Sequence, residues 1–367
     1  MRRGRRVLEV LGRSAGGISA HVARVTEGLD GRDGLVVDVA GPPDLPFAMP
    51  KPVRPVVIPD GLGGHAHAVR TLRSIVRSGG YEVVHAHGLR AGIDSGIAAR
   101  GPGILRCVTV HNLVLSDVTG GGAQAVFYKW AEPLAVRLNH KVFAPSEEIA
   151  HHLRATIPSA AEKVDVVPLG VGEEVPVVRS RDEVRAELGL AADARLIVTV
   201  SRLHPQKALH VLLGALAKLP SSVHLAVVGE GPLETELRGA AAELGVSQRV
   251  VWLGFREDVG DYVAAADVFC LSSRWEAVAL AAKEAVLVDT PVVATDVGGM
   301  RELLDDGVSG RLVPSDDPSA LAAALLDVLE HPDRAAMFTR NARAALAARF
   351  STADMLDRLY RAYTAAV

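Results

Sequence analysis

The 367-residue sequence has little cysteine, no long apolar run and no spaced glycine fingerprint of the G-x-G-x-x-G type. Its two cysteines exclude a disulfide framework or a cysteine metal cluster; Cys107 and Cys270 each lie in a β-branched run, where cysteine is usually a small buried hydrophobe. The longest apolar stretch, residues 277–294, contains three charged side chains, so a transmembrane helix is not expected. Without the glycine fingerprint, an NAD-dependent oxidoreductase is not expected.

The start of the chain, MRRGRRVLEVLG, begins with basic residues as a signal peptide does. Its apolar part is short and contains Glu9, so it predicts a first strand instead. We therefore expect a cytoplasmic protein. A hydrophobic content of 49% and a charged content of 23% are typical of a soluble globular chain, and the length predicts two domains.

Charge is distributed unevenly along the chain. Residues 1–170 contain 20 Lys and Arg against 15 Asp and Glu, a net charge of +5, which leaves −8 for the remainder of a chain whose total is −3. A basic half in an acidic protein indicates an anionic partner for that half.

Short apolar runs alternate with helical stretches in both halves, which is the pattern of parallel sheets covered on both faces. The expected strands are VLEVLG, GLVVDVA, EVVHAH, RCVTVHN, HKVFAPS and KVDVVPLG, then LIVTVSRL, HLAVVGEG, RVVWLGF, VFCL and PVVATDVGG. The proline-rich residues 40–64 are expected to form a loop. The fold class is α/β, with two doubly wound sheets. We place the domains at residues 1–172 and 173–349, followed by a last helix from Thr352 to about Tyr363.

Two segments of the first half have competing interpretations. The predicted helix HAVRTLRSIVRS sets Arg70, Arg73 and Arg77 at helical spacing, which fits a basic face on an anionic membrane, although an ordinary solvated face is the more common outcome. His85, His87 and His111 lie at predicted strand ends. A metal site there would need a third ligand with suitable geometry, so hydrogen-bonded histidines near a cleft are preferred.

Residues 272–299 contain the most informative pattern. Glu276 and Glu284 are eight positions apart, which on a helix places them within about 80° of each other, two turns apart. Both carboxylates would then face one cleft, beside a helix start whose free N–H groups favour a phosphate. The alternative is a partly buried helix with solvated glutamates. Arg202 and Lys207 follow an expected strand of the same half and are suited to a diphosphate, although this pattern alone favours ordinary surface ion pairs.

Together these residues resemble family 4 of the retaining glycosyltransferases, which have the GT-B fold. The likeness runs in order through nearly the whole chain, in the segments LEVLGRSAGGISAHV, VVHAHGLRAG, TVHN, VVPLGV, SRLHPQK, VVGEGP, LGF, SRWE, PVVATDVGG and SGRLVP. It implies an N-terminal acceptor-binding domain, a C-terminal domain for a nucleoside-diphosphate sugar of the UDP or GDP type, and a last helix that crosses back onto the first domain.

The resemblance also implies roles for single residues. Gly16 and Gly17 match a glycine loop that approaches the donor phosphates, and His111 matches a histidine near the transferred sugar. Arg202 and Lys207 match the basic pair on the diphosphate, Glu276 the glutamate on the donor sugar and Glu284 the one on the ribose. Gly254 and Phe255 match the base-binding edge. The remaining donor-binding residues are expected in the loop and helix start after Glu276, namely Ala277, Val278, Ala279 and Leu280.

The implied chemistry is metal-independent and uses no cofactor beyond the sugar nucleotide. Basic side chains and helix N–H groups would stabilise the leaving diphosphate, and the acceptor would attack on the face that the diphosphate leaves, with a covalent route through Glu276 as the competing mechanism. The expected acceptor is a sugar, a lipid-linked sugar or a small molecule, with peripheral contact at the inner face of the membrane as a further expectation and no nucleic acid.

The sequence departs from the family pattern near these residues. Ala277 and Ala279 stand where many members have glycine, as do Asp289, Ser201 and Ala208, and Leu169 replaces a common asparagine. Alanine keeps the backbone N–H but resists positive φ, so the loop after Glu276 would hold phosphate only with an ordinary backbone. A non-catalytic sugar-nucleotide-binding partner of another transferase therefore stays open as an alternative, as does another GT-B enzyme such as an epimerase.

Overall fold

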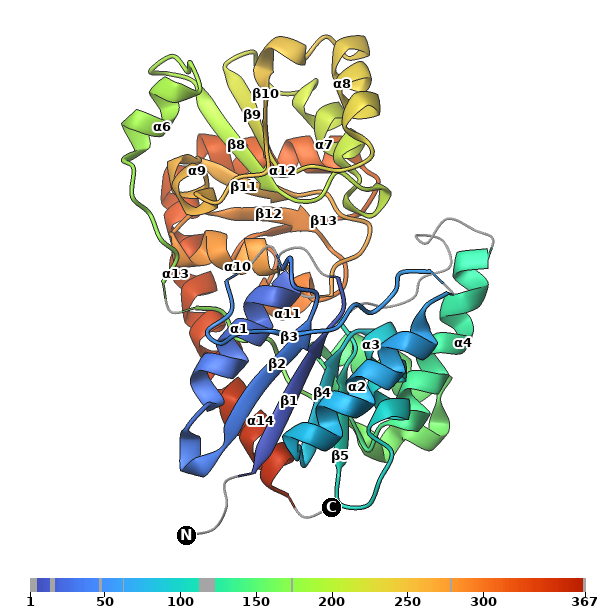
Figure 1. The fold of residues 1–367 in the computed structure, drawn as a ribbon. Coiled ribbons are helices and arrows are strands. Elements are labelled where there is room, and N and C mark those ends of the chain that lie inside the picture. Colours follow the sequence, from blue (N-terminus) through green and yellow to red (C-terminus); the bar gives the residue numbers. More distant parts are fainter. Residues whose placement is uncertain are drawn as a thin grey trace. The chain divides into compact units, whose positions relative to one another are not determined.

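The computed structural model describes residues 5–13, 17–45, 48–61, 63–111, 123–172, 174–277 and 279–365, without the side chains of 123–129 and 159. The chain divides into two compact units, unit 1 (Met1–Gly170 with Thr352–Val367) and unit 2 (Val171–Ser351) (Figure 1). The boundaries between the units follow residues 170 and 351, whereas the sequence predicted domain boundaries after residues 172 and 349. The last helix, α14 (Thr352–Thr364), is part of unit 1.

Unit 1 contains one seven-stranded parallel sheet in the order β3-β2-β1-β4-β5-β6-β7. Its strands are β1 (Arg6–Leu11), β2 (Val36–Gly41), β3 (Arg54–Pro55), β4 (Val83–His87), β5 (Leu105–Thr109), β6 (Lys141–Ala144) and β7 (Val164–Val166). Its helices, besides α14, are α1 (Gly17–Leu29), α2 (His65–Gly79), α3 (Leu89–Ala98), α4 (Ala123–Leu138) and α5 (Glu147–Thr156).

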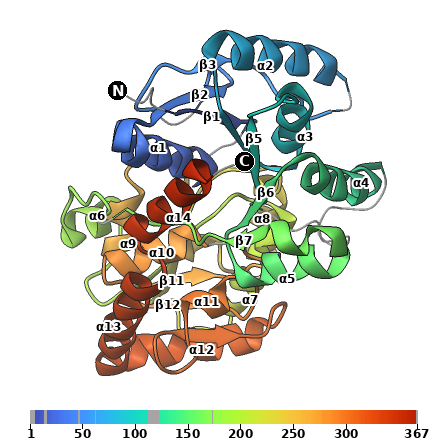
Figure 2. The ribbon, with the colours of Figure 1, turned by 90° about the horizontal axis from the view of Figure 1, so that it is seen from below.

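Both faces of this sheet are covered by helices, because its strands are apolar on both sides. Leu72 and Val76 of α2 pack with Leu8 on one face. On the other face, helices α1 and α14 pack with Val7, through Leu29 and Leu359 among others. Figure 2 shows α14 beside α1.

One prediction for unit 1 is wrong in detail. The proline-rich segment 40–64 is not loop throughout, since Arg54–Pro55 forms the short strand β3 and pairs with β2. Proline lacks the N–H that a central strand must donate, but β3 lies at the edge of the sheet, where that donor is not needed.

Unit 2 contains a six-stranded parallel sheet in the order β10-β9-β8-β11-β12-β13. The strands are β8 (Arg195–Val200), β9 (Val223–Val228), β10 (Val250–Gly254), β11 (Val268–Leu271), β12 (Val292–Thr295) and β13 (Arg311–Val313). The helices are α6 (Arg181–Glu187), α7 (Leu209–Leu216), α8 (Glu234–Glu243), α9 (Val259–Ala265), α10 (Leu280–Leu287), α11 (Met300–Leu303), α12 (Pro318–Glu330) and α13 (Pro332–Arg349).

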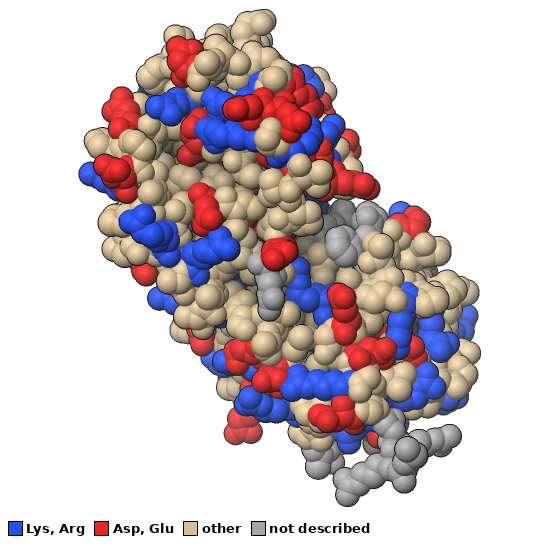
Figure 3. All heavy atoms as spheres, turned by 90° about the vertical axis from the view of Figure 1, so that its left-hand side faces the viewer, with Lys and Arg blue, Asp and Glu red and all other residues tan. Residues whose placement is uncertain are grey.

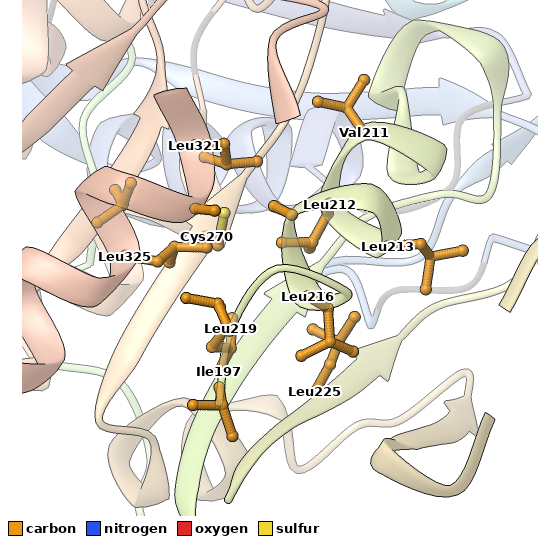
Figure 4. Close-up of a cluster of buried hydrophobic side chains, with 14 of the residues drawn as sticks. Ile197, Val211, Leu212, Leu213, Leu216, Leu219, Leu225, Cys270, Leu321 and Leu325 are labelled. Carbon is orange, nitrogen blue, oxygen red and sulfur yellow. The ribbon is translucent and has the colours of Figure 1, made fainter. Parts of the chain in front are cut away.

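The apolar core on one face of this sheet is shown in Figure 4. Leu212 and Leu216 of α7 and Leu325 of α12 pack with Ile197 of β8 and Cys270 of β11. As predicted, both cysteines are free and buried, and burial raises the pKa of each thiol. They are structural residues without a reactive thiolate at neutral pH.

The strand orders locate the expected binding edges. In each unit the order reverses once, between β1 and β4 in unit 1 and between β8 and β11 in unit 2. In open α/β sheets, ligands bind beyond the carboxyl ends of the strands at this reversal. The loops that follow β1, β4, β8 and β11 are therefore where functional side chains are expected, and the prediction of two doubly wound sheets is confirmed.

Candidate active site

The loop after β8 carries the predicted basic pair. It forms a single 3-10 turn, Pro205–Lys207, before α7 begins at Leu209. Lys207 therefore lies directly at the start of a helix and is partly buried. Arg202 lies earlier in the loop and is exposed, and no described residue forms a hydrogen bond or ion pair with its side chain. This leaves its guanidinium group available to an anion.

The loop after β11 is tied to the loop after β8 by hydrogen bonds. The side chain of Gln206 donates to the carbonyl of Trp275 at 2.8 Å, and the N–H of Arg274 donates to the carbonyl of Gln206 at 2.8 Å. Ser272 Oγ donates to the carbonyl of Lys207 at 3.0 Å. The two loops lie on either side of the strand-order reversal, and these hydrogen bonds hold them together.

These contacts bring Glu276 and Lys207 together. Lys207 Nζ lies 2.5 Å from Glu276 Oε1, and Ser273 Oγ donates to the same oxygen at 2.5 Å. Glu276 is only 4% exposed. A buried carboxylate needs both a counter-charge and hydrogen bonds, and Lys207 and Ser273 supply them. The carboxylate of Glu276 and the ammonium group of Lys207 therefore lie together beyond the carboxyl ends of β8 and β11.

Ser273 is a site residue that sequence reasoning missed. Its hydrogen bond to Glu276 could have been suggested by the S-x-x-E spacing, which is the spacing of a capping box. Here the pattern does not cap a helix. Instead the serine fixes the carboxylate, while Thr295 Oγ1 donates to the Ser273 carbonyl at 2.5 Å and holds the serine's backbone.

The prediction that Glu276 and Glu284 lie on one helix is wrong. Helix α10 begins only at Leu280, so Glu276 lies in the preceding loop while Glu284 lies on the helix, partly exposed. The carbonyl of Glu276 accepts a hydrogen bond from Gly299 N at 2.8 Å, outside any helical pattern. Ala279, with φ −71° and ψ 78°, ends the loop. The two carboxylates therefore occupy different elements, and helical phase does not relate them.

The backbone explains which glycine replacements are tolerated. Ala277 and Ala279 both have negative φ, so alanine fits there without strain. Ala208 (φ 45°) and Asp289 (φ 58°) adopt the left-handed conformation that glycine favours. A loop that holds phosphate with alanine in place of glycine needs an ordinary backbone, and Ala277 and Ala279 have one. Val278 of the same loop lies outside the described residues.

The residues predicted to bind the base, Gly254 and Phe255, lie at the end of β10. Gly254 has φ 64°, and the next side chain, Phe255, is 63% exposed. The N–H of Phe255 donates to Glu230 Oε1 at 3.2 Å. Glu230 follows β9, and sequence reasoning did not assign it. It places a carboxylate at the backbone N–H of this exposed aromatic residue.

Unit 1 places the other predicted residues beyond the carboxyl ends of its strands. Gly17 is the first residue of α1, and Gly16 lies outside the described residues. His111 lies two residues after the end of β5 and is 6% exposed, with Nε2 3.1 Å from Nδ1 of His87. Burial, and next the charge of His87, lower the pKa of His111 well below its usual value. His111 is therefore neutral at neutral pH.

The histidines are not all at strand ends. His85 lies in the middle of β4 and is fully buried, and its neighbour across the sheet is Glu9 of β1. Glu9 is the third potential metal ligand that sequence reasoning did not find, and the ligand atoms of Glu9, His85 and His87 lie within 4.8 Å of one another. Each of them already has hydrogen-bond partners in the protein, so the preferred interpretation of hydrogen-bonded histidines fits the geometry.

The comparisons with known proteins agree with this geometry. The family model described as Glycosyltransferase Family 4 matches residues 15–175, and the one described as Glycosyl transferases group 1 matches residues 180–345. A D-inositol 3-phosphate glycosyltransferase of Mycolicibacterium smegmatis is 31% identical over 96% of this chain and 87% of the relative. This chain belongs to the family 4 glycosyltransferases.

Two further relatives of this glycosyltransferase are informative. The Escherichia coli UDP-Gal:alpha-D-GlcNAc-diphosphoundecaprenol alpha-1,3-galactosyltransferase is 27% identical over 80% of this chain and 78% of the relative. The structure of Anabaena HepE in complex with UDP-glucose has a TM-score of 0.82 at 23% identity and covers 97% of this chain and 98% of HepE, which shows the GT-B fold. The present glycosyltransferase is thus a hexosyltransferase-type enzyme that transfers a sugar from a nucleotide sugar.

Proposed function

We propose that this glycosyltransferase transfers a hexosyl group to a hydroxyl acceptor with retention of configuration and without a metal ion. The observation that carries the proposal is the Lys207, Ser273 and Glu276 arrangement at the ends of β8 and β11. Breaking the bond from the anomeric carbon to phosphate builds negative charge on the leaving diphosphate. Arg202, Lys207 and the N–H groups at the start of α10 supply positive charge and hydrogen bonds suited to that group.

Glu276 serves in this proposal as a hydrogen-bond acceptor for hydroxyl groups of the donor sugar. A covalent route would need its carboxylate to attack the anomeric carbon. One of its oxygens already accepts from both Ser273 and Lys207, and such bonds stabilise the carboxylate and weaken it as a nucleophile. This favours attack by the acceptor on the face that the diphosphate leaves, with a phosphate oxygen taking the acceptor's proton.

Unit 1 supplies neutral groups in this proposal. His111 and the backbone of the loop at Gly17 would contact the sugar and the phosphates of the donor. In unit 2, Glu284 would bind the ribose hydroxyls. Gly254 and Phe255 would contact the base. UDP sugars are the preferred donor class, since the HepE complex contains UDP-glucose and the Escherichia coli relative is named for UDP-Gal. GDP sugars are the second class to test.

We propose a lipid-linked sugar as the first acceptor class to test, because the Escherichia coli relative is named for a diphosphoundecaprenol acceptor.

The basic face of α2 is smaller than predicted. Arg70 and Arg77 are exposed, whereas Arg73 is partly buried and donates to the carbonyl of Ile97 at 3.2 Å. Among the described residues, no helix has the length and apolarity needed to cross a membrane. On the face shown in Figure 3, basic and acidic side chains are interspersed.

The test begins with a thermal-shift screen of UDP, GDP, ADP and their sugars, since a ligand that binds only the native state raises the midpoint of unfolding. The selected donor is then incubated with hydroxyl acceptors, and the anomeric configuration of the product is determined by NMR. We expect retention and full activity in EDTA. An inverted product, or loss of activity that a divalent metal restores, would contradict the mechanism. Donor binding with neither transfer nor slow hydrolysis would favour the non-catalytic binding partner.

A further inference from the structure

Unit 1 buries a row of polar side chains on the face of its sheet that α1 and α14 cover. The strand register pairs Glu9 with His85, and His87 with Thr109, and His111 follows two residues after Thr109. Side chains two positions apart in a strand lie on the same face. All five are at most 6% exposed. The row leads from the centre of the sheet to the binding edge at His111.

Hydrogen bonds connect Glu9 to His111 through His87. His87 Nε2 lies 2.8 Å from Glu9 Oε2, and His87 Nδ1 lies 3.1 Å from His111 Nε2. Burial alone would raise the pKa of Glu9, but the charge of His85 and the hydrogen bonds from His85 and His87 lower it, so Glu9 is a carboxylate. A carboxylate only accepts hydrogen bonds.

The position of each proton then follows. Burial, and next the charge of His85, lower the pKa of His87 to about 4, so this ring carries one proton at neutral pH. That proton lies on Nε2, facing Glu9, which leaves Nδ1 as an acceptor. His111 must then donate through its Nε2–H. Since His111 is also neutral, its Nδ1 is the remaining acceptor of the ring.

The other oxygen of Glu9 is held by the last helix of the chain. Tyr363 of α14 donates to Glu9 Oε1 at 2.8 Å, and its oxygen lies 2.5 Å from Nδ1 of His85. His85 Nε2 in turn lies 2.8 Å from Thr109 Oγ1. Glu9 is thus fixed from both sides, and His85, Tyr363 and Thr109 form a branch that does not lead to His111.

We propose that Glu9 and His87 are positioning residues that hold the His111 ring as its Nε2–H tautomer, so that Nδ1 accepts a hydrogen bond from a hydroxyl group of the donor sugar. The inference rests on the proposed function for its last step, the contact with sugar. Its first step, the tautomer, depends only on the residues of unit 1. The two steps can therefore be tested separately.

The first test measures the tautomer directly in the full chain. With 15N-labelled histidine, long-range 1H–15N correlation spectra at pH 7.5 show which ring nitrogen carries the proton, and a His111→Asn spectrum assigns the signals. We expect Nε2–H at His111 in the wild type and in His87→Gln, whose amide oxygen can still accept. In His87→Leu, a mixture of tautomers is expected. An Nδ1–H tautomer at His111 in the wild type overturns the proposal.

The same protein should be analysed for bound metal before and after chelation. If Glu9 and His87 act through hydrogen bonds to His111, we expect no stoichiometric ion and histidine signals that chelation leaves unchanged. One zinc ion per chain, with His87 signals that shift on its removal, would assign Glu9, His85 and His87 as ligands and overturn the proposal.

The second test measures donor turnover with the nucleotide sugar selected by the thermal-shift screen. We expect His87→Leu to lower kcat about tenfold while inhibition by the free nucleoside diphosphate is unchanged, and His87→Gln to retain activity within about threefold. Thr109→Val is the matched control, because it removes a buried hydrogen bond from the side branch only, and it should retain activity within about twofold. Equal losses in Thr109→Val and His87→Leu would show a packing effect and overturn the proposal. If the wild type shows no turnover with any donor, the proposed function fails, while the tautomer result stands on its own.

Discussion

The two units share one strand arrangement but differ in the chemistry at its reversal. In unit 2 the loops after β8 and β11 present an exposed arginine and the Lys207 and Glu276 pair. In unit 1 the corresponding edge presents His111, a neutral ring at the end of a buried row. Charge suits the diphosphate and a neutral hydrogen-bonding group suits a sugar. The proposed function therefore assigns different binding roles to the two units, through the residues at their strand ends.

The comparison predicts that the largest loss comes from unit 2. Lys207→Ala and Glu276→Gln should each lower transfer by about 10²- to 10³-fold or more, because each removes a group that acts on the charged part of the reaction. Turnover at saturating donor measures the effect, with circular dichroism to verify folding. Arg238→Ala is the control, since it removes an ion pair with Glu234 on the exposed surface of α8. Activity near the wild-type value in both site variants would refute the assignment of this site.

A change at the unit 1 edge should have a smaller and different effect. We expect His111→Ala to lower kcat by about 10- to 100-fold, within the usual range for one positioned polar group, while the dissociation constant of the free nucleoside diphosphate stays the same. Calorimetry and initial rates separate the two quantities. His65→Ala, which removes a half-buried histidine bonded to Asp94 at 2.9 Å, is the control. Weaker binding of the nucleotide itself would mean that the two edges are not specialised in this way.

Acid should destabilise unit 1 more than unit 2. The folded state holds His87 neutral, with a pKa of about 4 against about 6.5 when unfolded, and burial also lowers the pKa values of His21 and His111. Between these values the unfolded state binds more protons, so stability falls as pH drops from about 6.5 toward 4, by up to about 1.4 kcal/mol per pH unit and histidine. Glu9 remains ionised over this range and adds no opposing change.

Hydrogen exchange at pH 7 and pH 5.5, corrected for intrinsic rates, measures this difference. Protection of β1, β4 and β5 should decrease more than that of β8 and β11, because the unit 2 histidines with lowered pKa values, His204 and His224, are only partly buried. In His87→Gln the decrease in unit 1 should be smaller. An equal decrease in both units, unchanged by this substitution, would show that the buried row does not control acid stability.

Sequence alone predicted most of the fold and which loops carry Lys207 and Glu276. Alternating β-branched runs give strands directly, and the order of motifs placed Lys207 and Glu276 on neighbouring loops. Sequence could not show that Glu276 precedes its helix, because alanine has the same helix propensity on both sides of the helix start. In the structure, the Glu276 carbonyl accepts a hydrogen bond from Gly299 N, a residue distant in sequence. Nor could it show the bonds from Glu9 to His87 and Tyr363, which join residues 78 and 354 positions apart.

The smallest expected effect concerns the backbone of the unit 2 loops. Ala208 adopts φ 45°, which costs roughly 1–2 kcal/mol for a residue with a side chain, whereas glycine loses about 0.5–1 kcal/mol more entropy on folding. Ala208→Gly should therefore raise the free energy of unfolding by up to about 1 kcal/mol, measured by urea denaturation. Ala279→Gly is the matched change at φ −71° and should lower it by about 0.5–1 kcal/mol, since glycine relieves no strain there. Opposite signs would show that the loop after Glu276 accepts alanine because its backbone is ordinary, while the turn at Lys207 retains a conformation made for glycine. Equal signs would contradict this distinction.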